Sequence, residues 1–129
     1  MTQHAVLDTS IFIAIERGRG LGRPLPDTPA VSVVTLAELE LGVLVARDAT
    51  SRSQRLATLT RLREQTSGLP IDDRVASAYA RLAAQQLADG RRPRVHDTWI
   101  AATALVHDAA VWTQDADFSA LSDVEVVRV

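Results

Sequence analysis

Apolar residues along the chain occur either in short continuous runs or at the three- and four-residue spacing of helices, and the two patterns alternate. The short runs predict strands at residues 5–7, 31–34, 69–71, 110–112 and 124–129. The helical spacing predicts helices at residues 10–17, 35–47, 51–64, 73–87 and 97–107, with one further helical turn at residues 117–121. Residues 18–29 contain several glycines and prolines and are expected to form a surface loop.

The order of these elements predicts the fold class. Strands that alternate with helices are connected by right-handed crossovers, which place helices on both faces of a parallel sheet. We therefore expect an α/β fold with three layers, α/β/α, and a small, mainly parallel sheet at the centre. With 129 residues, the chain is expected to form one domain over residues 1–129. The helix at 73–87 is predicted to bury Ala76, Tyr79, Ala83 and Leu87.

Composition excludes several classes of protein. The chain has no cysteine, which excludes disulfides, thiolate zinc sites, iron–sulfur clusters and a cysteine nucleophile. All 14 basic residues are arginine, and the lack of lysine excludes phosphate-loop nucleotide binding and Schiff-base chemistry. Because no apolar run approaches the ~18 residues of a membrane span, we expect no membrane association and a cytoplasmic protein.

Acidic residues recur where predicted strands end or predicted helices begin. They are Asp8, Glu38, Asp97, Asp115 and Asp117. The carboxyl ends of parallel strands meet at one edge of the sheet, which is where ligands bind in open α/β folds. We therefore expect these carboxylates to lie close together, although they come from four separate segments of the chain.

Helix capping is the simpler interpretation of each acid taken alone. Asp8 or Ser10 could cap the first helix, residues 35–38 match a capping box, and Asp97 precedes a predicted helix. Capping does not explain why an acid follows each strand, since Ser, Thr and Asn cap about as well without adding charge. The two interpretations remain open for each residue.

A cluster of acids needs a cation. Two carboxylates ~5 Å apart repel by roughly 3 kcal/mol at an effective dielectric of 20. Carboxylate oxygens favour Mg²⁺ or Mn²⁺ over zinc, and His96 is expected to support such a site rather than to bind the ion. Divalent ions held this way activate water and orient a phosphodiester, so phosphoryl hydrolysis is the predicted reaction.

Three arginines precede Asp97 closely. Arg91, Arg92 and Arg94 are candidates for binding the phosphate backbone of a substrate, because a guanidinium binds phosphate through two hydrogen bonds. The alternative is that they only form a solvated helix surface.

Four short motifs resemble those of the PIN-domain nucleases, in particular the VapC-type toxins of bacterial toxin–antitoxin pairs. They lie at residues 6–10, 35–42, 96–102 and 113–118. Each motif alone is a weak signal, but the four occur in this order and at these separations across nearly the whole chain.

The resemblance implies a PIN-like fold with a metal site. The implied ligands are Asp8, Glu38, Asp97 and Asp115, with Asp117 as a further contributor and with Ser10 and Thr113 in support. It also implies Mg²⁺-dependent endoribonuclease activity, a homodimer, and neutralisation by a cognate VapB-type antitoxin that covers the site. His96 and Gln114 depart from the family pattern, in which Asn and a charged residue are common, so their roles stay open.

Two other functions compete with this one. A haloacid dehalogenase-like phosphatase also places an Asp after its first strand, but Asp8-Thr9-Ser10 lacks the second Asp of that family, and the chain lacks its lysine. A non-catalytic PIN-like binding module would keep the scaffold and dock a partner. Binding of Mn²⁺ at the acidic edge distinguishes the nuclease from such a module.

Overall fold

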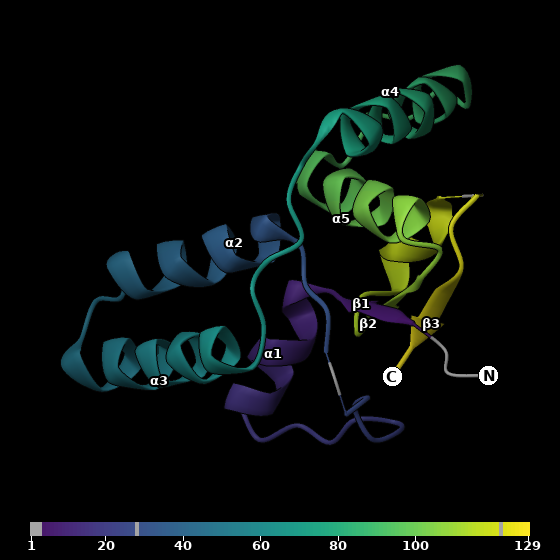
Figure 1. Cartoon of the computed structure of the whole chain (residues 1–129). Coiled ribbons are helices and arrows are strands. Elements are labelled where there is room, and N and C mark those ends of the chain that lie inside the picture. The colour runs from purple at the N-terminus through teal and green to yellow at the C-terminus, as the bar shows by residue number, and fades with distance from the viewer. Residues whose placement is uncertain (1–3, 28, 122) are drawn as a thin grey trace.

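The computed structural model describes residues 4–27, 29–121 and 123–129, so Thr28 of the predicted loop lies outside the described residues. The elements run β1 (Ala5–Leu7), α1 (Thr9–Glu16), α2 (Val33–Leu44), α3 (Ala49–Gln65), α4 (Asp73–Ala88), α5 (Val95–Val106), β2 (Ala110–Thr113), the 3₁₀ turn η1 (Ala116–Ala120) and β3 (Val126–Arg128). Each predicted helix is confirmed within about three residues at its ends. Figure 1 shows their arrangement.

The three strands form a parallel sheet in the order β1-β2-β3. Val6 pairs with Val111, and both side chains belong to the buried cluster under α4 and α5. Leu7 pairs with Trp112, and both point to the opposite face, where α1 packs. Side chains that alternate between two covered faces confirm the predicted α/β/α layers (Figure 1).

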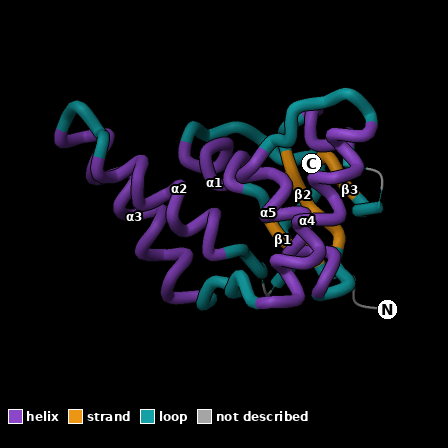
Figure 2. The backbone as a smooth tube through the Cα atoms, turned by 90° about the horizontal axis from the view of Figure 1, so that it is seen from above, coloured by secondary structure: helices purple, strands orange, loops and turns teal. Residues whose placement is uncertain are grey.

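Helices α2 and α3 lie side by side and extend away from the sheet (Figure 2). Asp48 begins α3 as its N-cap, accepting a 2.7 Å hydrogen bond from the Ser51 N–H. The buried residues Leu59 and Leu62 fix α3 to the rest of the molecule. Other apolar side chains of this hairpin remain exposed: Leu41, Leu44, Val45 and Leu56.

The strand predicted at residues 31–34 is wrong. Ala30 and Ser32 each make only an isolated bridge, and α2 begins two residues before the predicted helix. Ser32 explains the difference, because its hydroxyl accepts a 3.0 Å hydrogen bond from the Val34 N–H and caps α2. Val33 and Val34, two of the β-branched residues that suggested a strand, therefore lie in the first turn of a helix.

Two further strands are shorter than predicted. The strand predicted at residues 69–71 is reduced to one bridge, between Leu69 and Ser32. The strand predicted at residues 124–129 is confirmed only over Val126–Arg128. The 3₁₀ turn η1 confirms the helical turn predicted just before it.

The buried face of α4 is displaced by one position from the prediction. Val75, Ala78, Leu82 and Gln86 are buried, whereas Leu87 is 63% exposed. The predicted row and the observed row both have helical spacing. Because the observed row contains the polar Gln86, the fully apolar predicted row was the better candidate for the buried face. The buried Gln86 side chain is hydrogen-bonded to Arg94 and Thr98 at the start of α5.

The described helices include none that is both long and apolar enough to cross a bilayer.

Candidate functional site

The four acids that the sequence singled out come from four elements and meet at the carboxyl edge of the sheet. Asp8 directly follows β1, Asp115 lies two residues after β2, Glu38 is on α2, and Asp97 is in the first turn of α5. Asp97 experiences the negative charge of all three others. The structure therefore brings these acids into one electrostatic environment at this edge.

Asp8 is the most deeply buried of the four acids, at 5% exposure. Its Oδ2 accepts hydrogen bonds from the Ser10 hydroxyl at 2.6 Å and from the Thr113 hydroxyl at 2.9 Å. The Ser10 N–H adds a third, longer bond of 3.3 Å. These bonds fix the orientation of the carboxylate and compensate for its burial.

Thr113, the last residue of β2, connects two of the acids. Its hydroxyl donates to Asp8 and accepts a 2.9 Å hydrogen bond from the backbone N–H of Asp115. Thr113, at the end of the central strand, therefore sets the positions of Asp8, which follows β1, and of Asp115, which precedes η1.

Glu38 lies at the other side of the site. Its Oε1 accepts a 2.9 Å hydrogen bond from the hydroxyl of Thr9. Its Oε2 is 3.5 Å from Nδ1 of His96, an exposed residue in the first turn of α5. Glu38 thus links α2 to both α1 and α5.

Arg94 connects Asp97 and Asp115 through a single nitrogen atom. Its Nη2 lies 2.9 Å from Oδ2 of Asp97 and 3.0 Å from Oδ2 of Asp115. The Asp97 side chain is 19% exposed and that of Arg94 is 45% exposed, so the guanidinium reaches a largely buried carboxylate from the solvent side.

The pKa values of these two acids move in opposite directions. Burial, with the charges of the other three acids, raises the pKa of Asp97 to about 6 against the opposing effect of Arg94. The pKa of Asp115 is lowered, first by the hydrogen bond that its carboxylate accepts from the Asp117 N–H and then by Arg94. The pKa of Asp97 therefore lies close to neutral pH, whereas Asp115 stays charged there.

The first turn of α5 is held by a buried polar network rather than by its own cap. Arg94 is the N-cap residue, but its side chain makes no capping hydrogen bond. Instead, Oε1 of Gln86 accepts from the Arg94 N–H at 3.3 Å, and Nε2 of Gln86 donates to the Thr98 hydroxyl at 2.9 Å. That hydroxyl in turn donates to the Arg94 carbonyl at 2.6 Å. The sequence analysis missed Gln86, and its place in the buried row of α4 was the available signal.

Capping accounts for two of the four acids. Asp8 is the N-cap of α1, and Asp115 is the N-cap of η1, where it accepts a 2.9 Å hydrogen bond from Asp117. Asp97 and Glu38 lie inside their helices, because α5 begins before Asp97 and Ser32 caps α2. The capping box suggested for residues 35–38 is therefore wrong.

The remaining predicted residues lie around the acids. Arg91 and Arg92 are exposed on the connection between α4 and α5. The Asp117 side chain is also exposed, and its recorded contact with Asp115 is made by its backbone.

The chemistry of the donors fits a hard divalent cation. Mg²⁺ and Mn²⁺ prefer carboxylate oxygens, and the Arg94 guanidinium already places positive charge against two of them. In the side-chain arrangement described, however, no three His, Asp or Glu residues within the described ranges are grouped closely enough to hold one ion. Side-chain movement is therefore needed before the acids can share a cation.

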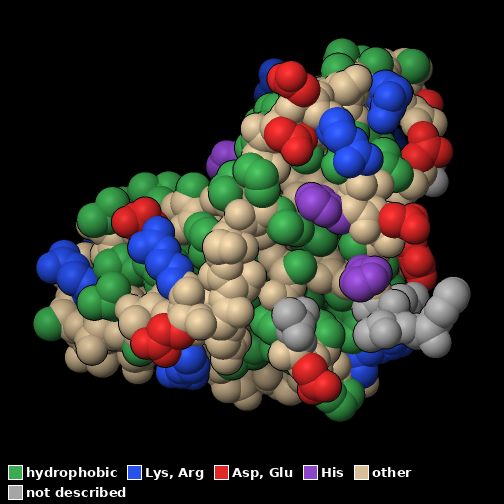
Figure 3. Space-filling view, viewed as in Figure 1, with side chains coloured by type: hydrophobic (Ala, Val, Ile, Leu, Met, Phe, Trp, Pro, Cys, Tyr) green, Lys and Arg blue, Asp and Glu red, His purple; other side chains and the backbone are tan. Residues whose placement is uncertain are grey.

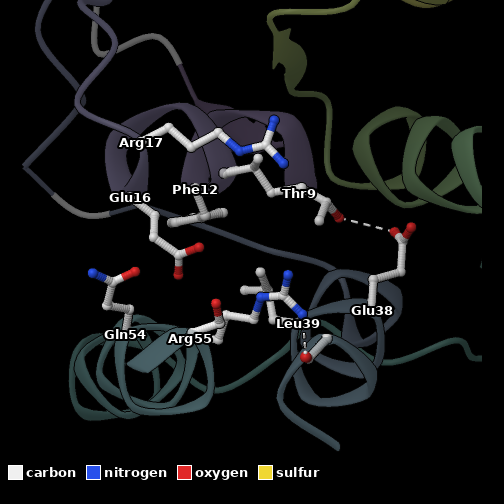
Figure 4. Close-up of a pocket in the computed structure, with 11 residues that line it drawn as sticks. Thr9, Phe12, Glu16, Arg17, Glu38, Leu39, Gln54 and Arg55 are labelled. Atoms are coloured by element: carbon white, nitrogen blue, oxygen red, sulfur yellow. Dashed lines mark hydrogen bonds between the residues drawn. The ribbon is translucent and has the colours of Figure 1, made fainter. Parts of the chain in front are cut away.

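A cleft of about 530 Å³ adjoins the acids and is formed by α1, α2 and α3. It shares Thr9 and Glu38 with the site, and Figure 4 shows the hydrogen bond between them at one end of the cleft. Phe12 and Leu39 supply apolar lining, while Arg55 donates to the Gly42 carbonyl at 2.7 Å. The sequence did not predict this cleft, because it depends on how three helices pack.

A family model described as "PIN domain" matches residues 5–124. The chain belongs to the PIN-domain family. Ribonuclease VapC5 of Mycobacterium tuberculosis is 50% identical to this PIN domain over 128 residues, which cover 96% of this chain and 94% of the relative. Ribonuclease VapC4 of the same organism is 42% identical over 132 residues, with 98% of both chains covered. These similarities identify the chain as a VapC-type member of the family.

Solved structures agree with the fold of this PIN domain. The crystal structure of VapBC-5, a member of the VapBC family of toxin-antitoxin systems from Mycobacterium tuberculosis, matches with a TM-score of 0.88 at 45% identity, covering 99% of this chain and 100% of the other. FitAcB from Neisseria gonorrhoeae matches with a TM-score of 0.72 at 28% identity, with 95% of both chains covered. The predicted PIN-like fold is confirmed.

His96 and Gln114, whose roles the sequence left open, both make contacts near the acids. His96 approaches Glu38, as described above. The backbone N–H of Gln114 donates to the Ser10 hydroxyl at 3.0 Å, and its side-chain amide donates to the carbonyl of Val129. Gln114 therefore connects Ser10, which hydrogen-bonds to Asp8, with Val129 just after β3.

Proposed function

We propose that this VapC-type PIN domain is a metal-dependent endoribonuclease that acts as the toxin of a toxin–antitoxin pair. The observation that carries the proposal is the burial of Asp97 among three acids from distant segments of the chain. Acids crowded in this way are stabilised by a divalent cation and are otherwise unfavourable. The relatives named as ribonucleases support RNA as the substrate.

The proposed ligands of Mg²⁺ or Mn²⁺ are Asp8, Glu38, Asp97 and Asp115. When bound, the cation supplies Lewis acidity, which lowers the pKa of the attacking water and neutralises charge on the scissile phosphate. The hydroxyl groups of Ser10 and Thr113 orient Asp8. The Thr113 hydroxyl also positions Asp115 by accepting a hydrogen bond from its backbone N–H. The hydrolysis then needs no side chain as nucleophile.

The arginines beside Asp97 are proposed to bind the RNA backbone. Arg91, Arg92 and Arg94 are exposed on the segment that leads into α5, and a guanidinium can bind a phosphate through two hydrogen bonds. Asp117 is proposed as a further contributor at the same edge. Binding through phosphates alone would leave the cleavage sequence to be set by other contacts.

A VapB-type antitoxin is proposed to cover the site, and the chain is proposed to form a homodimer. Figure 3 shows hydrophobic side chains gathered over α2, where Leu41, Leu44 and Val45 are exposed. Such a surface suits a protein partner. The cleft between α1, α2 and α3 is lined in part by Glu38, so a partner bound in it would lie next to one of the acids. A single domain over residues 1–129, acting in the cytoplasm, completes the proposal.

Cleavage of total RNA by the purified chain, with and without EDTA, tests the proposed activity. We expect Asp8→Asn and Asp97→Asn to reduce cleavage by at least about 100-fold, because each removes a proposed ligand. Asp89→Asn, at the exposed C-cap of α4, is the matched control and should cleave like the wild type. EDTA should abolish cleavage and the cognate antitoxin should suppress it. Full activity in both site variants, or activity unaffected by EDTA, would contradict the proposal.

The same assay addresses the alternatives. Membership of the PIN-domain family leaves the haloacid dehalogenase-like phosphatase without support. A non-catalytic PIN-like module would fold normally and leave RNA intact with Mn²⁺ present.

A further inference from the structure

We propose that Arg94 is an internal counter-cation, which a divalent ion displaces when it binds the acids. The inference rests on the proposed function, because it takes the acids as cation ligands. Nη2 of Arg94 lies 2.9 Å from Asp97 and 3.0 Å from Asp115, so one positive group joins α5 to η1. A bound divalent ion would make the same connection with a higher charge.

Arg94 and a divalent ion would compete because both would contact the same carboxylate oxygens of Asp97 and Asp115. Oδ1 of Asp115 accepts a 2.9 Å hydrogen bond from the Asp117 N–H, and Oδ2 is the oxygen that faces a positive charge, that of Arg94. Arg94 holds that oxygen, together with Oδ2 of Asp97. An ion that binds both Oδ2 atoms has to take the place of the Arg94 nitrogen.

Arg94 can leave without disturbing the helix. Its backbone is fixed, because its N–H donates to the buried Gln86 and its carbonyl accepts from the Thr98 N–H at 2.8 Å and the Thr98 hydroxyl at 2.6 Å. Its side chain, in contrast, is 45% exposed and can rotate into solvent. Withdrawal of the guanidinium therefore needs only a change of rotamer, while Asp97 keeps its position on α5.

Displacement of Arg94 would couple cation binding by the acids to RNA binding by the arginines. The released guanidinium would lie on the same exposed connection as Arg91 and Arg92, where it can pair with a phosphate. Cation binding would then free the arginine that is proposed to bind the substrate. In the absence of a cation, the same arginine stabilises the acids.

Mn²⁺ affinity, measured by electron paramagnetic resonance, tests the competition. Arg94→Gln should bind Mn²⁺ about three- to tenfold more tightly than the wild type, given the modest strength of partly exposed ion pairs. Arg91→Gln and Arg92→Gln are matched controls, since each removes one positive charge, and within the described residues neither side chain is paired with an acid. They should change the affinity by less than about twofold, because salt screens charges that are not in contact.

An affinity of Arg94→Gln equal to or weaker than that of the wild type would overturn the inference, because Arg94 would then support the cation site. If the wild type and all three variants bind no Mn²⁺, the proposed function itself fails, so the two failures are distinguishable.

NMR of the arginine Nε–Hε groups in the wild-type chain provides a second measurement that does not depend on a variant. The Arg94 signal should be rigid without metal and mobile with saturating Mg²⁺. A signal that stays rigid at saturation would also overturn the inference.

Discussion

Burial and the charges of three neighbouring carboxylates raise the pKa of Asp97 to about 6. At neutral pH it is nevertheless mostly charged, with Arg94 at 2.9 Å as its partner. Asp8 is more deeply buried but has two hydroxyl donors. The two carboxylates are therefore held in different ways: Asp8 accepts hydrogen bonds from two hydroxyl groups, and Asp97 forms an ion pair with Arg94.

The raised pKa of Asp97 predicts a specific pH dependence of stability. Between its ordinary pKa of 3.8 and its folded pKa of about 6, the folded chain binds more protons at Asp97 than the unfolded chain. The contribution of Asp97 to the free energy of unfolding therefore falls as the pH rises through this window. Asp97→Asn removes that loss, so it should gain stability relative to the wild type from about pH 4 to about pH 7.

Urea unfolding of the metal-free proteins at these two pH values measures the difference. Asp89→Asn, which changes an exposed acid, should follow the wild type. A constant difference between Asp97→Asn and the wild type would show that the raised pKa is wrong.

At the scale of elements, α4 positions the start of α5. Gln86 is 5% exposed and bonds to both Arg94 and Thr98. Gln86 accepts a hydrogen bond from the N–H of the N-cap residue Arg94, a bond that the third helical residue accepts in a capping box and that here comes from a neighbouring helix. The position of Asp97 therefore depends on contacts between two helices.

Replacement of Gln86 tests this dependence. Gln86→Leu leaves the Arg94 N–H and the Thr98 hydroxyl without their partner and should lower the free energy of unfolding by about 1–3 kcal/mol. Gln85→Leu, an exposed position on the same helix, should change it by less than about 0.5 kcal/mol. Equal stabilities of the two variants in urea unfolding would contradict the role given to Gln86.

The sequence indicated which acids share one edge of the sheet, although it misplaced some of the elements that carry them. Asp8 and Asp115 were predictable because each follows a buried strand whose end faces the ligand-binding edge. Glu38 acts on the same acid, Asp97, through its charge, although the strand proposed before it is a helix start. The contacts of Arg94 and Gln86 were not predictable, because they depend on the path between α4 and α5 and on side-chain rotamers.

At the scale of the whole molecule, the fold brings distant segments of the chain to one edge. The central strand β2 ends at Thr113, which bonds to Asp8 from more than a hundred residues away in sequence. The α2–α3 hairpin extends from the same edge and adds an exposed apolar surface and a cleft that reaches Glu38 (Figures 2 and 4). The molecule therefore combines a partly buried group of acids with an exposed apolar surface.

The central claim is that four carboxylates from separate elements hold one cation site. An anomalous difference map from crystals soaked in Mn²⁺ tests this claim most directly, because it locates the ion without reference to activity. The account predicts a peak about 2.0–2.3 Å from carboxylate oxygens of both Asp8 and Asp97. A fully occupied peak elsewhere, or no peak at these acids at saturating Mn²⁺, would contradict it.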